Sequence, residues 1–272
     1  QTHRRADRHA DGGSQLAMTD FFAGPEYTGA PFVLFGTAHL IGLALVALAN
    51  VALFYVRDHA GEKARRNIRY GLAALLIVNE IAWHLWNWAT GQWTVQTMLP
   101  LHLCSVLVWL SAYMLVTKNR TIYEFAYLLG IAGALQALLT PDAGIYGFPH
   151  FRFFQVILSH GAIVTAALYM TIVEGFRPTW ASVRRVLVGS YLYMLNVWVI
   201  NDLLGSNYLF IAHKPETASL LDVLPAWPGY IPIIIALGVS FILLFYLPFA
   251  IKDARYKTQT RQKIGNHRLH AD

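Results

Sequence analysis

The chain has 272 residues, of which 56% are hydrophobic and only 13% are charged, and its mean hydropathy is +0.42. Soluble domains carry about 25% charged residues, so this composition excludes an ordinary soluble protein and predicts an all-α, polytopic membrane protein. The formal net charge of +6 does not require a nucleic-acid partner, because basic residues beside membrane spans account for it. A single cysteine excludes an intramolecular disulfide.

The N-terminal residues differ in character from the rest of the chain. Residues 1–17 are polar and rich in charge, and no apolar stretch follows their arginines directly, so we do not expect a cleaved signal peptide. They are typical of a disordered tail, either a translated leader upstream of Met18 or an added segment. We therefore expect residues 1–30 to be a disordered or extracytoplasmic tail.

Seven apolar segments follow, each close to the ~20 residues that a helix needs to cross a bilayer. Turn-forming residues such as Pro141, Pro178 and Gly205 separate them. The sequence predicts a bundle of seven transmembrane helices over residues 31–252, followed by a basic cytoplasmic tail over 253–272. The predicted spans are 31–56, 69–88, 99–117, 121–140, 151–174, 185–204 and 229–251.

Basic residues are distributed unequally between the two sides of these spans. The first, third and fifth loops and the C-terminal tail hold sixteen Lys and Arg residues, whereas only Arg152 and Lys214 lie near the spans on the other side. The positive-inside rule predicts a protein of the cell membrane with its N-terminus outside and its C-terminus in the cytoplasm.

With this orientation, the polar residues of the spans gather in the outer half of the membrane. Ionisable groups within spans normally face protein or water, so the pattern predicts a cavity that opens outward and holds functional groups. The residues concerned are His39, Glu80, His84, Asn87, His102, Cys104, His160 and Asn201, followed by Asn207 and Tyr208.

Helical spacing relates some of these residues to one another. Glu80, His84 and Asn87 follow the i, i+4, i+7 pattern of one helix face, either as an oriented imidazole or as a structural hydrogen bond between helices. His102 and Cys104 lie roughly 200° apart around one helix, so they cannot share one small site. If Cys104 is a nucleophile, its base comes from another helix. His160, on an otherwise apolar face, is the best candidate, although a lone histidine there can also be a packing residue.

Several short motifs resemble the YwaF family of bacterial membrane proteins, distant relatives of a eukaryotic integral-membrane acyltransferase, transmembrane protein 164. The resemblance implies a seven-helix lipid acyltransferase with a cysteine and a histidine at its centre. It departs from the eukaryotic pattern at Leu101, where the relative has its cysteine, and at Gly229, where a bulky aromatic residue is expected. The matching residues are Leu99-Pro100-Leu101-His102-Leu103-Cys104, Asn201, Asn207-Tyr208, Leu221-Asp222 and Trp227-Pro228.

The expected chemistry is nucleophilic acyl transfer with membrane lipids as donor and acceptor. Cys104 attacks an acyl ester with His160 as general base, and a lipid alcohol or water resolves the thioester. Asn201, Asn207, Tyr208 or His102 donates to the oxyanion, and Glu80, His84, Asn87 and His39 line the site. No cofactor or metal is expected, since neither His-x-x-x-His nor Cys-x-x-Cys spacing occurs.

Two other classes of function remain open. Intramembrane Glu80 and Asp202 suit a proton-coupled transporter or channel, although the inner halves of the spans lack polar residues and no inverted repeat is visible. In a non-catalytic lipid-binding or scaffolding protein, the polar cluster would only hold the helices together. The oligomeric state does not follow from the sequence.

Overall fold

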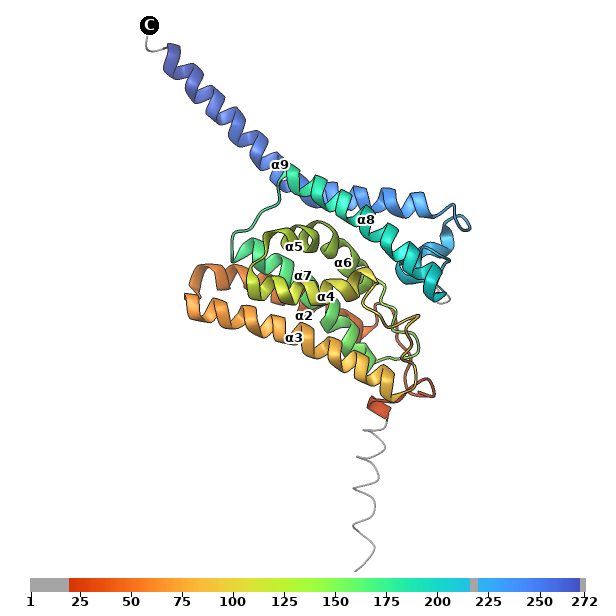
Figure 1. The fold of residues 1–272 in the computed structure, drawn as a ribbon. Coiled ribbons are helices and arrows are strands. Elements are labelled where there is room, and N and C mark those ends of the chain that lie inside the picture. Colours follow the sequence, from red (N-terminus) through yellow and green to blue (C-terminus); the bar gives the residue numbers. More distant parts are fainter. Residues whose placement is uncertain (1–19, 216–219, 270–272) are drawn as a thin grey trace, which may run out of the picture.

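The computed structural model describes residues 20–215 and 220–269, with side chains as far as Tyr256, and within these residues the fold is entirely helical (Figure 1). Seven helical segments follow one another at the places where the sequence has its apolar segments. They are α2 (Thr37–His59), α3 (Glu62–Ala89), α4 (Leu103–Thr117), a continuous helix made of α5 (Arg120–Phe125), the π-helical turn η1 (Ala126–Gly130) and α6 (Ile131–Leu139), then α7 (Phe151–Ile172), α8 (Trp180–Leu204) and α9 (Ile231–Leu269).

Five of these seven segments are long and apolar enough to cross a membrane. The exceptions are α3, which carries several charged and polar residues, and α4, which has 15 residues and is therefore about 22 Å long. The hydrocarbon core is about 30 Å thick, so length and composition alone support five of the seven predicted spans. The chain is a multi-pass membrane protein.

The third segment begins later than its apolar run predicts. The sequence places its start near Pro100, but α4 begins at Leu103 and His102 is its N-cap residue. The Leu99 amide donates a hydrogen bond to the hydroxyl of Tyr208, 109 residues away. This tertiary contact holds residues 99–101 in a turn, so Pro100 is not in the first turn of the helix.

Helix α7 is the centre of the bundle and contacts α2, α3, α4 and α6. Small residues let its neighbours approach closely. A Cβ on Gly161 would lie 2.7 Å from the Val46 side chain of α2, and a Cβ on Gly42 would lie 3.3 Å from Ile157. In the most apolar stretch of α7, 72% of the residues are buried, against 17% in α2 and α8 and 11% in α9. The latter three helices form the outer surface.

Helices α8 and α9 run side by side and lie on the far side of α5 and α6 from α2 and α3 (Figure 1). Near the start of α8, Arg185 pairs with Glu124 of α5 at 2.6 Å. Farther along, the Tyr193 hydroxyl donates to the Leu101 carbonyl at 2.8 Å. Phe245 and Phe249 of α9 contact the ring of Tyr127. The pair is thus tied to the other helices at separate points along its length.

The loops after α3, α6 and α8 lie at the same end of the bundle as the residues that precede α2 (Figure 1). The segment predicted as a tail is partly packed there. The Trp86 indole donates to the Phe22 carbonyl at 2.9 Å, and His150 Nε2 donates to the Ala23 carbonyl at 3.0 Å. These contacts hold residues 22–23 against the ends of α3 and α7. Residues 1–17, expected to be disordered, lie outside the described residues.

Candidate functional site

Cys104 lies in the first turn of α4 and faces α6. A Cβ added to Gly133 would lie 3.9 Å from its sulfur. Val108 and Ser111, farther along the same face of α4, are completely enclosed, yet Cys104 retains exposed surface. Among the described residues the thiol has no hydrogen-bond partner. The thiol is therefore only partly enclosed by its neighbours.

His160 on α7 is also partly exposed although its neighbours on the same helix face are buried. Val156 and Val164, one turn to either side, are buried, whereas His160 is only half-buried. Its Nδ1 lies 2.8 Å from the Val156 carbonyl, which accepts only, so Nδ1 carries the proton. In the neutral ring Nε2 is then free to accept a proton. Within the described part of the chain, no hydrogen bond joins His160 to the Cys104 thiol.

The helices that carry these two residues pack directly against each other, since α4 and α7 are in contact. The third and fifth helical segments are therefore neighbours.

Glu80 and His84 form the pair that their spacing predicts on α3. His84 Nε2 lies 3.6 Å from Glu80 Oε1, and the Trp93 indole donates to His84 Nδ1 at 3.1 Å. Because Nδ1 accepts, Nε2 carries the hydrogen that points to the carboxylate. Glu80 is only 3% exposed. Asn87, one turn beyond His84, donates to the carbonyl of Trp83 within its own helix.

Arg152, in the first turn of α7, belongs to the same region, and its side chain is half-buried. The guanidinium lies 4.1 Å from the centre of the Trp83 ring, donates to the Gln155 side chain, and donates to the Asp142 carbonyl at 2.8 Å. From the sequence alone, Arg152 is only a basic residue near a span. An arginine at the start of an otherwise apolar helix was the available signal.

Asn201 and Tyr208 build the turn after α8. The Asn201 carbonyl oxygen accepts from the Tyr208 amide at 2.8 Å and from Ser206 at 2.9 Å, and its amide nitrogen donates to the Tyr208 carbonyl at 2.9 Å. The Tyr208 hydroxyl accepts from Leu99 and donates to the Val95 carbonyl at 2.7 Å. Burial raises the pKa of Tyr208, which keeps this hydroxyl protonated. Both side chains hold loops together.

Asn207 and His39 also have their polar groups engaged by nearby backbone. Asn207 accepts from the amides of Ala212 and His213 and donates to the His213 carbonyl. His39 Nδ1 accepts from the Phe35 amide at 3.0 Å, and Nε2 donates to the Leu138 carbonyl at 2.8 Å. His39 thereby joins α2 to the end of α6 in this arrangement.

His102 faces a different neighbour from Cys104, as their spacing predicts. Its Nδ1 accepts from the Leu209 amide at 3.3 Å, and its ring contacts Tyr208 and Phe210. Cys104 instead faces α6. His102 therefore lies against the loop between α8 and α9, on another side of α4.

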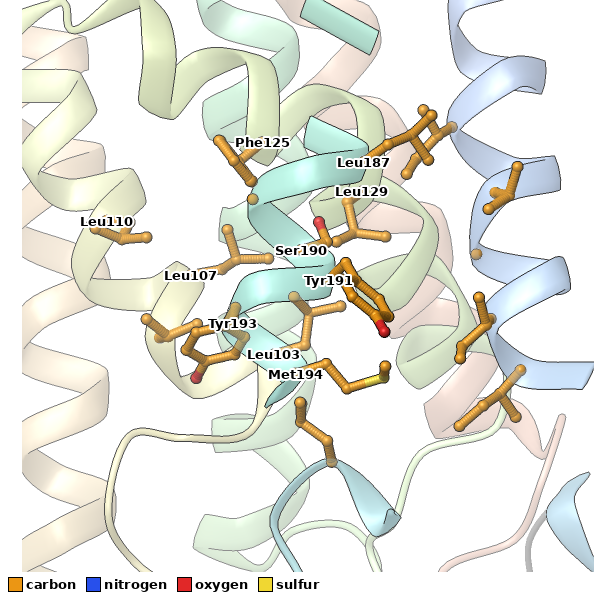
Figure 2. A pocket seen from close by; sticks show the side chains of 18 of the residues that line it. Leu103, Leu107, Leu110, Phe125, Leu129, Leu187, Ser190, Tyr191, Tyr193 and Met194 are labelled. Carbon is orange, nitrogen blue, oxygen red and sulfur yellow. The ribbon is translucent and has the colours of Figure 1, made fainter. Parts of the chain in front are cut away.

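Two large cavities lie beside this polar region, and both are apolar. The first, of about 520 Å³, lies between α4, α5, α8 and α9. Figure 2 shows Leu103 and Leu107 of α4 and Tyr191 and Met194 of α8 around it. The second, of about 680 Å³, lies between α2, α3 and α7. None of the polar residues predicted from the sequence lines either cavity. Both volumes fall within the range of ~300–1,000 Å³ that ligand sites occupy.

A thiol and an imidazole with a free acceptor nitrogen lie on adjacent helices. Within the described residues, no group of three or more His, Cys, Asp or Glu side chains could hold a metal ion.

A model of a known protein family matches most of the chain. The model is described as the TMEM164 family, and the match covers residues 34–246. It includes all of the helices that carry the polar residues described above. No curated protein matches the chain. No solved structure matches it.

Proposed function

This chain belongs to the TMEM164 family, and from that premise we propose that it is an integral-membrane lipid acyltransferase with its site at Cys104 and His160. The acyl groups come from membrane lipids and pass to a second lipid alcohol or to water. We also propose that the chain belongs to the bacterial YwaF branch, and the motif Leu99-Pro100-Leu101-His102-Leu103-Cys104 supports this. We also propose seven membrane-crossing segments, with the N-terminus outside and the C-terminus in the cytoplasm.

One observation carries the proposal. Cys104 in the first turn of α4 and His160 on a largely buried face of α7 each retain exposed surface, and their helices pack against each other. A cysteine that only fills space is normally enclosed as a small hydrophobe. Both side chains retain exposed surface on helices that are in contact, and this supports a nucleophile and its base at these positions.

The protonation of His160 fits the role of general base. Nδ1–H is fixed by the Val156 carbonyl, so Nε2 accepts the proton of the Cys104 thiol, and the thiolate attacks the carbonyl carbon of an acyl ester. The tetrahedral intermediate then breaks its ester C–O bond, and His160 returns the proton to the departing alkoxide. The products are a lysolipid and an acyl thioester on Cys104.

The second half of the reaction reverses these proton transfers. An acceptor alcohol gives its proton to His160 and attacks the thioester carbonyl, and the C–S bond breaks to release a new ester. The thiolate recovers the proton from His160. With water in place of the alcohol, the product is a free fatty acid. Catalytic hydrogen bonds of this type commonly reach full strength only in the substrate complex.

The test uses purified protein in bilayers that contain a diacyl phospholipid with a labelled acyl chain and an unlabelled lysolipid. Wild-type protein should move label to the lysolipid or release labelled fatty acid. Cys104→Ala should abolish turnover, and His160→Ala should reduce it by about 10²–10⁴-fold, since a positioned base contributes that much. Ser111→Ala is the matched control, because Ser111 lies on the same face of α4 and its hydroxyl has no hydrogen-bond partner among the described residues.

Each alternative has its own outcome. Turnover that survives Cys104→Ala but disappears with His160→Ala would show an enzyme with a different nucleophile. A complete lack of turnover with every acceptor would reject the acyltransferase. In that case, proton-coupled uptake by the wild type that is lost in Glu80→Gln would identify a transporter. No proton-coupled uptake by the wild type would favour a scaffold.

A further inference from the structure

Arg152 is a cation held inside the bundle without a carboxylate partner. Among the described residues, no Asp or Glu oxygen lies within 4.0 Å of its guanidinium, whereas Arg69, Arg177 and Arg185 each pair with a carboxylate. An arginine side chain has five N–H donors. The described acceptors are the Gln155 side chain and the Asp142 carbonyl, which leaves three N–H groups free to bind a ligand.

The orientation of Arg152 is fixed before any ligand arrives. The guanidinium is stacked on Trp83 at 4.1 Å, and its two hydrogen bonds anchor opposite parts of the group to α7 and to the loop that precedes it. A planar guanidinium fixed in this way suits bidentate binding of a carboxylate or phosphate. The arrangement resembles a prepared anion site rather than a solvated surface arginine.

The position of Arg152 relative to Cys104 and His160 indicates which anion it binds. Arg152 lies two turns before His160, about 12 Å along the axis of α7, at the end of the bundle where the loops gather (Figure 1). Arg152 stacks on Trp83 of α3, and α3, α4 and α7, which carry Glu80, Cys104 and His160, all contact one another. Along α7 the guanidinium lies toward the loops and His160 lies deeper in the bundle.

We propose that Arg152 binds the phosphate of the lipid substrate and thereby positions the acyl ester at Cys104. The inference rests on the proposed acyltransferase function and adds the residue that distinguishes a phospholipid from a neutral ester. In a glycerophospholipid the phosphate and the acyl esters are attached to one glycerol, so holding the phosphate at the loop end directs an ester toward His160. Arg152 is a substrate-binding residue and takes no part in proton transfer.

The first experiment compares substrates with and without phosphate. Arg152→Gln should raise the KM for a diacyl phospholipid by roughly 10–100-fold, which corresponds to loss of one charge-assisted contact. Turnover of the matching diacylglycerol should change less than about threefold. Arg152→Lys should recover part of the phospholipid activity, since a lysine keeps the charge without the planar fork. Arg177→Gln, which removes an exposed ion pair with Asp253, is the control and should match wild type.

Two results of this experiment would overturn the inference. Equal losses for phospholipid and diacylglycerol in Arg152→Gln would show a structural role and overturn the inference. Unchanged KM for the phospholipid would overturn it as well.

A binding experiment separates this inference from the acyltransferase proposal. Dihexanoyl phosphatidylcholine should raise the Tm of the purified wild-type protein by more than dihexanoylglycerol does, and Arg152→Gln should remove that difference. If nothing is turned over but the Arg152-dependent difference persists, the enzyme proposal fails and the phosphate site stands. If inorganic phosphate alone gives the same Arg152-dependent rise, or if the two lipids stabilise wild type equally, the lipid-phosphate assignment is wrong.

Discussion

At the residue scale, Glu80 and Trp93 together fix the orientation of the His84 ring. The imidazole is fixed between the Glu80 carboxylate at 3.6 Å and the Trp93 indole at 3.1 Å. In the proposed reaction His160 is the base, and Glu80 only orients His84. Removing the Glu80 carboxylate should therefore reduce the rate less than removing His160.

We therefore expect Glu80→Gln to weaken acyl transfer by about tenfold or less, well below the effect of His160→Ala. His84→Gln should have a similar effect, and the double variant should lose little more than either single one, because the two residues act as one unit. The measurement is turnover in the bilayer assay. Complete loss of turnover in Glu80→Gln, with the Tm unchanged, would assign the carboxylate a direct chemical role.

A second prediction at the residue scale concerns how His150 makes the stability of the protein depend on pH. It caps α7 through Nδ1, which accepts from the Arg152 amide, while Nε2 donates to Ala23. The bond to the Arg152 amide needs the neutral ring, because a protonated Nδ1 cannot accept, and burial lowers the pKa of His150 below its unfolded value of about 6.5. Its contribution to stability is therefore complete above pH ~6.5 and is lost as pH falls through the lower folded pKa.

The test is the Tm of wild type and His150→Asn between pH 7.5 and 5. Asparagine is a good N-cap residue but does not titrate, so His150→Asn should show a smaller decrease in Tm toward pH 5. His59→Asn, at an exposed histidine, should retain the wild-type profile. Parallel curves for wild type and His150→Asn would contradict the assignment.

At the scale of elements, the attachment of α8 to α5 depends on Glu124. Its carboxylate accepts from the buried Ser182 hydroxyl at 2.8 Å and from Arg185. Close approach of the helices supports this contact, since a Cβ on Gly189 would lie 2.5 Å from the Phe125 ring. The cavity of Figure 2 begins beside this junction.

Glu124→Ala should lower the free energy of unfolding by about 1–3 kcal/mol, because the buried Ser182 hydroxyl loses its acceptor. The decrease should appear as a lower Tm in detergent. Arg57→Ala, which removes an exposed ion pair with Asp58, should leave the Tm unchanged. Equal effects of the two substitutions would show that the Glu124 contact does not hold α8 in place.

At the scale of the whole molecule, the topology is the prediction to test first. In a Cys104→Ala background, Lys214→Cys should react with a membrane-impermeant thiol reagent in intact cells. A cysteine in place of Lys257 should react only after permeabilisation, because sixteen basic residues mark its side of the spans as cytoplasmic. The reverse pattern would place the Cys104 region on the cytoplasmic half and overturn the outward orientation.

The sequence predicted the helical segments well because each is an apolar run bounded by prolines, glycines or charges. It also predicted the Glu80–His84 pair and the separation of His102 from Cys104, since both follow from spacing within one helix. The later start of α4 and the structural contacts of Asn201 could not be predicted. They depend on Tyr208, which meets Leu99 across 109 residues, and helical periodicity contains no information about such distant contacts.

The environment of Arg152 at the candidate site could not be predicted from the sequence either. Its sequence position identifies a basic residue beside a span, which the topology rule already explains. Its stacking on Trp83 and the lack of a described carboxylate partner appear only when α3 and α7 are packed together.

The unequal burial of the helices has a consequence for how sequences of this family diverge. Helix α7 is enclosed on most sides, whereas α2, α8 and α9 face outward over most of their length. On the outward faces one apolar residue can replace another with little change in helix packing. Substitutions there should therefore have little effect on stability. On α7, even a methyl group on Gly161 meets Val46. We expect homologues to vary most along α2, α8 and α9 and to keep α7 nearly unchanged, including positions that never touch a substrate.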